Sequence, residues 1–399
     1  MKKDRDQVAI KDHDQKEMLY KHFRAQGWMA QIEVPIITEK GIKKKPPQVT
    51  DIDVLGIRPS AELRWHLIIG DCKTWVHISP VNRVLWVRGL QQAMQASSSI
   101  VLVKRRERQQ IERDHKLFAD QLGVLLIQEE EFATYDQSVI YPAGSAAYEE
   151  SIDVLEAIRT RIGGGFPPLR GLVQWLMCGA WAIIDHAILL RKLMGQIQKA
   201  RGEIDPRRDD HLALIFEMAS AFGIPFASLT GKVFRSHLKP DQRELLEDAV
   251  RLIIWGGREQ YDFYNAVRQQ LIAAKGGDPG EQLAFPNWNE FLELLRNYLE
   301  APHLAFKTPQ LLRSVGMGVF TGAPADALSR IDDRMLLHLA LKLAVYVCRA
   351  AKLPQDAVER MKALFNPRIT QLVELPESSA RAREDQPLIQ NPEKSRGEQ

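Results

Sequence analysis

The chain has 399 residues, of which 45% are hydrophobic and 26% charged, a composition typical of globular proteins and long enough for two domains. The formal net charge of +3 neither requires nor excludes a nucleic-acid partner, so local basic clusters must carry that argument. The three cysteines lie far apart, which argues against a disulfide framework. The first residues lack the apolar stretch of a signal peptide, so we expect a cytoplasmic protein.

The first 130 residues alternate between helix and strand patterns. Residues 15–26 place Met18, Leu19 and Phe23 on one side of an amphipathic helix, which Gly27 ends. The chain then predicts strands at 28–37, 49–57 and 63–70, a helix at 82–96, a strand at 100–103, a helix at 107–122 and a strand at 124–127. The order α-β-β-β-α-β-α-β predicts a mixed α/β domain over residues 1–135.

The character of the chain changes after residue 135. Residues 136–150 are expected to form a linker, residues 151–372 a mostly α-helical domain, and the polar residues 373–399 a disordered tail. Helices are predicted at 151–161, 169–200, 209–222, 240–272, 288–300, 307–315, 331–351 and 354–364. Residues 172–190 are long enough to span a bilayer, but Gln174, Asp185 and His186 favour a buried helix and no membrane contact.

Three polar side chains interrupt the second and third predicted strands. Asp53 lies early in one strand, and Asp71 and Lys73 close the next. Because residues two apart in a strand face the same side, Asp71 and Lys73 should converge with Asp53 across the hairpin. The alternative interpretation is an incidental surface salt bridge, since the pattern Asp-x-Lys also occurs at 14–16 and 114–116.

Two carboxylates beside one ammonium suit phosphodiester hydrolysis. Asp53, Asp71 and the backbone carbonyl of Cys72 would bind Mg²⁺, for which Mn²⁺ could substitute, because Mg²⁺ prefers oxygen ligands. Lys73 would position a water and offset negative charge in the transition state. Glu17 in the first helix is a further candidate carboxylate.

Residues 15–130 resemble the PD-(D/E)XK nuclease superfamily, which has the restriction-endonuclease-like fold. The resemblance rests on the order of elements, on Asp53 in the segment IDVLG and on Asp71-Cys72-Lys73 at the end of the next strand. It implies that Asp53 and Asp71 bind metal and that Lys73 is catalytic. Glu17 matches an acidic residue that some members carry on the first helix. Gln91 or Gln92 loosely matches a polar residue on the later helix.

Two basic clusters are candidates for contacts with nucleic-acid phosphates. Lys43, Lys44 and Lys45 precede two prolines, and Lys104, Arg105 and Arg106 follow an apolar strand. Contacts of this kind add salt-dependent affinity that is independent of base sequence. The alternative interpretation, a solvated loop and a solvated helix start, stays open.

These features favour a Mg²⁺-dependent endonuclease that cleaves DNA in restriction, defence or repair. The helical domain would bind DNA, a partner protein or a second copy of the chain to form a homodimer. The alternative hypothesis is a catalytically inactive, nuclease-like subunit for nucleic-acid binding or assembly, whose function lies in the helical domain.

Overall fold

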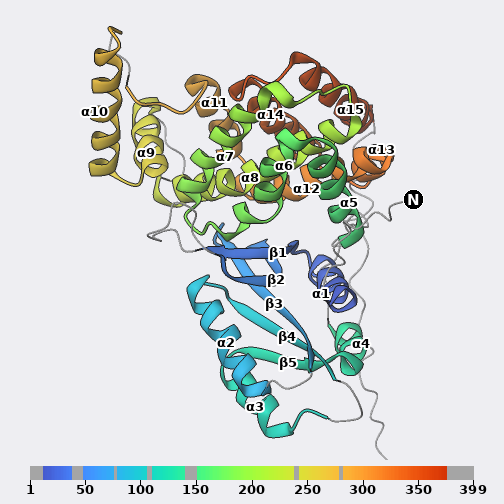
Figure 1. The fold of residues 1–399 in the computed structure, drawn as a ribbon. Coiled ribbons are helices and arrows are strands. Elements are labelled where there is room, and N and C mark those ends of the chain that lie inside the picture. The colour runs from blue at the N-terminus through green and yellow to red at the C-terminus, as the bar shows by residue number, and fades with distance from the viewer. Residues whose placement is uncertain are drawn as a thin grey trace, which may run out of the picture.

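The computed structural model describes residues 12–37, 48–75, 79–105, 110–139, 151–237, 242–277 and 282–374. It consists of an N-terminal α/β region and a mostly helical C-terminal region, which confirms the predicted fold class (Figure 1). The predicted order of elements is also confirmed. The elements are α1 (His13–Ala25), β1 (Met29–Ile37), β2 (Gln48–Pro59), β3 (Trp65–Trp75), α2 (Pro80–Ala93), β4 (Ser98–Arg105), α3 (Arg113–Gln121) and β5 (Val124–Gln128).

A further helix, α4 (Glu129–Ser138), follows the last strand and includes the first residues of the predicted linker. A capping box between Gln128 and Glu131 starts this helix. Residues 140–150 of the predicted linker and residues 375–399 of the predicted tail lie outside the described residues.

The five strands form one mixed sheet in the order β1-β2-β3-β4-β5. The first three strands are antiparallel neighbours, whereas β3, β4 and β5 are parallel. A parallel connection needs a crossover, which α2 supplies between β3 and β4. Val101, Leu102 and Val103 in β4 are all buried, as expected for a strand that is covered on both faces.

Helices cover both faces of this sheet. On one face α1 packs closely, because a Cβ atom at Gly70 would lie 2.9 Å from Leu19 Cδ1. On the other face α2 and α3 pack on β4 and β5 through a small apolar core. The register pairs Asp71 with Val101 and Lys73 with Val103, and both valines belong to that second core. Asp71 and Lys73 therefore lie on the α2 face.

The C-terminal region is helical in every described element. Its helices are α5 (Ile152–Gly165), α6 (Pro167–Met177), α7 (His186–Ala200), α8 (Asp209–His237), α9 (Arg243–Trp255), α10 (Arg258–Ala274), α11 (Trp288–Leu299), α12 (Pro302–Thr321), α13 (Pro324–Ser329), α14 (Arg334–Ala350) and α15 (Gln355–Glu374), with two short 3₁₀ turns, η1 (Gly179–Ala182) and η2 (Arg201–Glu203).

Two helices that the sequence predicts as continuous are each divided in two, so these two predictions are wrong. The helix predicted at 169–200 is broken between α6 and α7, where Asp185 accepts hydrogen bonds from the N–H groups of Ala187 and Ile188 and so starts α7. The helix predicted at 240–272 is broken between α9 and α10, because Gly256 ends α9 with a left-handed φ of 84°.

Among the described residues, one helix is long and apolar enough to cross a membrane. It is α8, and 94% of its most apolar window is buried inside the protein. The predicted membrane candidate at 172–190 is divided between α6, η1 and α7. The length of α8 is therefore explained by its place in the middle of the helical core.

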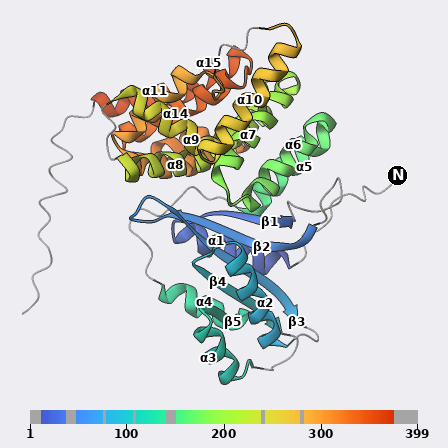
Figure 2. The ribbon, with the colours of Figure 1, turned by 90° about the vertical axis from the view of Figure 1, so that its left-hand side faces the viewer.

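The helical region covers the β1 edge of the sheet and the tip of the β2–β3 hairpin (Figures 1 and 2). Arg313 in α12 is fully buried, forms an ion pair with Glu217 and donates a hydrogen bond of 2.8 Å to the carbonyl of Ala30 in β1. The indole of Trp65 donates to the carbonyl of Ile224 at 3.0 Å. The Arg313 contact covers part of the edge strand β1, which would otherwise expose its backbone groups, and the Trp65 contact holds the start of β3 against α8.

Candidate metal centre

Acidic side chains lie in a row across the three antiparallel strands. The β2–β3 register ends at the pair Val54 and Gly70, and continuing it by one residue sets Asp53 opposite Asp71. The pairs on either side of Glu33 place it opposite Asp53. Glu33 has a φ of 55°, a left-handed conformation that costs on the order of 1 kcal/mol in a non-glycine residue. Asp51 lies two residues before Asp53 in the same strand.

The carboxylates of Glu33, Asp51 and Asp53 form one group that could hold a metal ion. One ligand oxygen of each lies within 4.8 Å of the others. Asp53 is buried, whereas the other two are half-buried. Three carboxylate oxygens are hard ligands of the kind that Mg²⁺ and Mn²⁺ prefer, so the donor set fits such a cation chemically.

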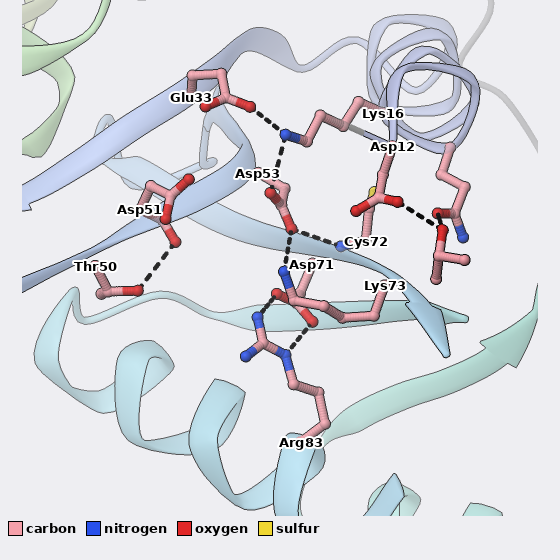
Figure 3. Close-up of polar contacts among 12 residues, drawn as sticks. Asp12, Lys16, Glu33, Thr50, Asp51, Asp53, Asp71, Cys72, Lys73 and Arg83 are labelled. Carbon is pink, nitrogen blue, oxygen red and sulfur yellow. Dashed lines mark hydrogen bonds and ion pairs between the residues drawn. The ribbon is translucent and has the colours of Figure 1, made fainter. Parts of the chain in front are cut away.

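Lys16 from α1 points into this group (Figure 3). Its Nζ lies 3.1 Å from Asp53 Oδ1 and also contacts Glu33, and its side chain is only 3% exposed. Burial alone would lower the pKa of Lys16, but Asp53 and Glu33 together raise it above the ordinary lysine value. A positive charge therefore already lies between two of the carboxylates.

Lys73 approaches Asp53 from the other side. Its Nζ lies 3.6 Å from Asp53 Oδ2, and the same oxygen accepts a hydrogen bond of 2.8 Å from the N–H of Cys72. The side chain of Lys73 is 27% exposed, in contrast to that of Lys16. Of the two lysines on Asp53, Lys73 is the one that a ligand from solvent can reach.

Asp71 is paired with Arg83 in α2, a residue that the sequence did not single out. The Arg83 guanidinium donates to both Asp71 oxygens, through Nε at 2.6 Å and through Nη2. It also lies 3.7 Å from the ring centroid of Trp86, which holds it in place. Burial raises the pKa of Asp71 above the ordinary carboxyl value, and Arg83 opposes that shift. Both oxygens of Asp71 are therefore already engaged by Arg83.

The remaining residues singled out from the sequence lie in different surroundings. Glu17 accepts a hydrogen bond of 3.0 Å from the N–H of Ile152 and pairs with Lys21, so it connects α1 to the start of α5. Gln91 is buried and accepts from Ser99 Oγ at 3.1 Å, whereas Gln92 is exposed. Both glutamines belong to α2.

The structure describes only some residues of the two predicted basic clusters. Lys104 forms an ion pair of 3.0 Å with Glu129 at the start of α4. Arg105 is the last residue of β4. Lys43, Lys44, Lys45 and Arg106 lie outside the described residues.

Four residues of the site escaped the reasoning from sequence. Asp51 shares the strand face of Asp53 by simple alternation, so the pattern DID could have identified it. Glu33 is the single acid within the first strand, WMAQIEVPII. Lys16 belongs to the Asp-x-Lys pattern at 14–16, which has no strand context to set it apart. No sequence pattern near Arg83 indicates a role at the site, because only the crossover through α2 brings Arg83 to Asp71.

Comparisons of the chain with protein-family models, with curated proteins and with solved structures found no match. The structure itself shows an α/β region with a five-stranded mixed sheet, and a three-carboxylate group on it that could hold a metal ion.

Proposed function

We propose that the α/β region is a PD-(D/E)XK-like, Mg²⁺-dependent endonuclease that hydrolyses phosphodiester bonds in DNA. The observation that carries the proposal is the convergence of Glu33, Asp51 and Asp53 with the half-exposed Lys73. A buried Asp that gathers two further carboxylates and an accessible lysine is a candidate for a functional site. The role we propose is in restriction, defence or repair in the cytoplasm.

In this proposal the residues have separate tasks. A bound Mg²⁺ would supply a cationic centre that polarises phosphate oxygens and acidifies water. Asp53 would hold it together with Glu33 and Asp51, because their oxygens already lie close together. Lys73 would place its ammonium against the scissile phosphate and offset the charge that develops there. The Cys72 N–H fixes the Asp53 carboxylate, which limits its motion during the reaction.

Arg83 gives Asp71 a conditional role. A guanidinium binds phosphate in the same two-pronged manner as it binds carboxylate, so a DNA phosphate can compete with Asp71 for Arg83. Departure of Arg83 would release the buried Asp71 carboxylate next to Asp53. We propose that Asp71 becomes a metal ligand only when the nucleic acid is present.

The experiment that tests the proposal is a cleavage assay on linear duplex, supercoiled and single-stranded DNA. The purified protein is incubated with Mg²⁺, with Mn²⁺ or with EDTA. Cleavage with either metal and none with EDTA is the expected result. Absence of cleavage on every substrate, while the protein remains folded, would contradict the proposal.

A second candidate function is a nuclease-like subunit that binds nucleic acid without cutting it. One observation favours it: Asp53 and Asp71 each already have a buried or half-buried cation as partner, namely Lys16 and Arg83. Retained DNA binding without metal-dependent cleavage would support this function instead.

We also propose that the chain forms a homodimer through α10. Among the described helices, α10 exposes the most large apolar side chains, Phe263, Tyr264, Val267 and Leu271. This helix lies at the margin of the molecule (Figure 1). In an antiparallel pairing of two copies centred on Val267, Phe263 faces Leu271 of the second copy. The same register sets Glu259 against Lys275, so the apolar stripe and the charges are both self-complementary.

Replacing Phe263 by Glu should convert this dimer into a monomer. The substitution places a charge in the middle of the apolar stripe, where the second copy would bury it without a partner. Molar mass measured by light scattering should fall from twice the chain mass to the chain mass. The matched control is Phe263→Leu, which keeps the stripe apolar and should remain dimeric. A wild-type protein that is monomeric at high concentration would contradict the dimer.

A further inference from the structure

A cavity of about 240 Å³ lies between the α/β region and the helical region. Its walls come from the β2–β3 hairpin, from the C-terminal end of α2, and from η1, α7 and α8. None of the carboxylates of the candidate metal centre lines it. Trp65, which does line it, precedes Asp71 by six residues, about 20 Å of extended strand. The cavity is therefore separate from the metal centre.

Most of the lining is apolar or aromatic. Trp65 and Trp181 contribute rings, and aliphatic side chains complete the wall, namely Ile57, Leu67, Ile184 and Leu189. This volume is many times what one water molecule needs, so the cavity has room for a small organic molecule. A mostly apolar pocket of this kind at a boundary between regions is a common place for a small ligand.

The polar groups in the wall are few and include no carboxylate. His186 is hydrogen-bonded through Nδ1 to Ser228 Oγ, and its Nε2 makes no hydrogen bond within the part of the chain that the structure describes. Burial lowers the pKa of His186 to about 4, so the ring is neutral at pH 7. The His186–Ser228 pair can therefore donate a hydrogen bond to a ligand, or accept one from it, without adding charge to the cavity wall.

Two arginines give the exposed rim of the cavity a positive charge. Arg64 and Arg235 both line it and are both exposed. The guanidinium of Arg235 donates to the carbonyls of Leu63 and Glu62, which fixes it beside the hairpin. Burial and the neighbouring charge of Arg64 lower the pKa of Arg235. Glu62 lies outside the lining but near Arg64, so it offsets part of this charge. Two guanidiniums side by side repel each other, and an anionic group bound to both would reduce that repulsion.

We propose that this cavity binds a small amphipathic anion. The apolar chain or ring would lie between Trp65 and Trp181, and a carboxylate or phosphate head would lie on Arg64 and Arg235. Because both regions contribute walls, the ligand would stabilise their association by RT ln(1 + [L]/Kd), where [L] is the free ligand concentration. The inference does not depend on the proposed nuclease activity.

The test is calorimetric titration of the full-length protein with sodium octanoate, octyl phosphate and octanol. We expect saturable binding of one molecule of octanoate or octyl phosphate per chain, and the tighter of the two identifies the head group. Octanol should bind at least about tenfold more weakly, because it lacks the charge that the arginines recognise.

Variants make the test specific to this cavity. Arg64→Gln should weaken binding of the preferred anion by about tenfold or more, and Arg235→Gln likewise. Arg64 is exposed, so its variant carries the test even if Arg235→Gln loosens the hairpin. Ala221→Leu should abolish binding by filling the cavity, whereas Arg243→Gln, an exposed arginine on α9, should leave it unchanged. Binding of neither anion would overturn the proposal, as would anion binding that is unaffected by Arg64→Gln and Ala221→Leu.

Discussion

Replacing Lys73 by Met should lower the rate of Mg²⁺-dependent DNA cleavage by about 10²–10⁴-fold. Lys73 Nζ lies 3.6 Å from Asp53 Oδ2 at the accessible side of the carboxylate group. Its ammonium would offset charge on the phosphate, and Met keeps most of the side-chain length without that charge. Single-turnover cleavage of a duplex substrate at saturating protein measures the effect on the chemical step.

A matched control separates this role from a general loss of positive charge. Lys116→Met removes a lysine from α3 that pairs with Glu131, away from the carboxylate group. Its cleavage rate should equal that of the wild type, and thermal unfolding should show that both variants remain folded. A Lys73→Met protein that cleaves at the wild-type rate would remove Lys73 from the mechanism.

Replacing Lys16 by Met should destabilise the protein by about 3–5 kcal/mol in EDTA. The side chains of Lys16 and Asp53 are 3% and 7% exposed, so loss of the ammonium leaves buried carboxylate charge without compensation. Addition of Mg²⁺ or Mn²⁺ should then raise the unfolding temperature more than it does in the wild type, because the cation replaces the missing charge. Lys21→Met, an exposed lysine on the same helix, is the control.

The pH dependence of this ion pair has a definite sign. The pKa of Lys16 is raised in the folded state, so folded protein holds this proton more tightly than unfolded protein does. The stabilisation is complete below the ordinary lysine pKa and is lost as the pH rises through the raised value. The difference in stability between Lys16→Met and wild type should therefore persist at pH 7. Equal unfolding temperatures at pH 7 in EDTA would show that the ion pair contributes nothing.

Local patterns were sufficient to predict the elements of the α/β region. The amphipathic spacing of Leu19 and Phe23 places them in the core, where a Cβ atom on Gly70 would meet them both. The apolar run at Val101 to Val103 predicts a central strand, and it lies between β3 and β5. Short-range periodicity determines these features, so a sequence reveals them.

Long-range pairing was beyond the reach of the same patterns. Arg83 reaches Asp71 only because α2 crosses over the sheet, and no spacing along the chain indicates that contact. The buried Arg313 contacts Ala30 from 283 residues away. The sequence does not reveal the breaks between α6 and α7 and at Gly256, because apolar residues continue across both.

Binding of Mn²⁺ to the wild type and to Asp53→Asn is the most direct measurement of the central claim. Free Mn²⁺ can be followed by electron paramagnetic resonance without any substrate or cleavage. We expect the wild type to bind Mn²⁺ and Asp53→Asn to bind it more weakly by at least about tenfold, because the shared ligand loses its charge. Equal binding by the two proteins, or no binding by the wild type, would contradict a metal centre at Glu33, Asp51 and Asp53.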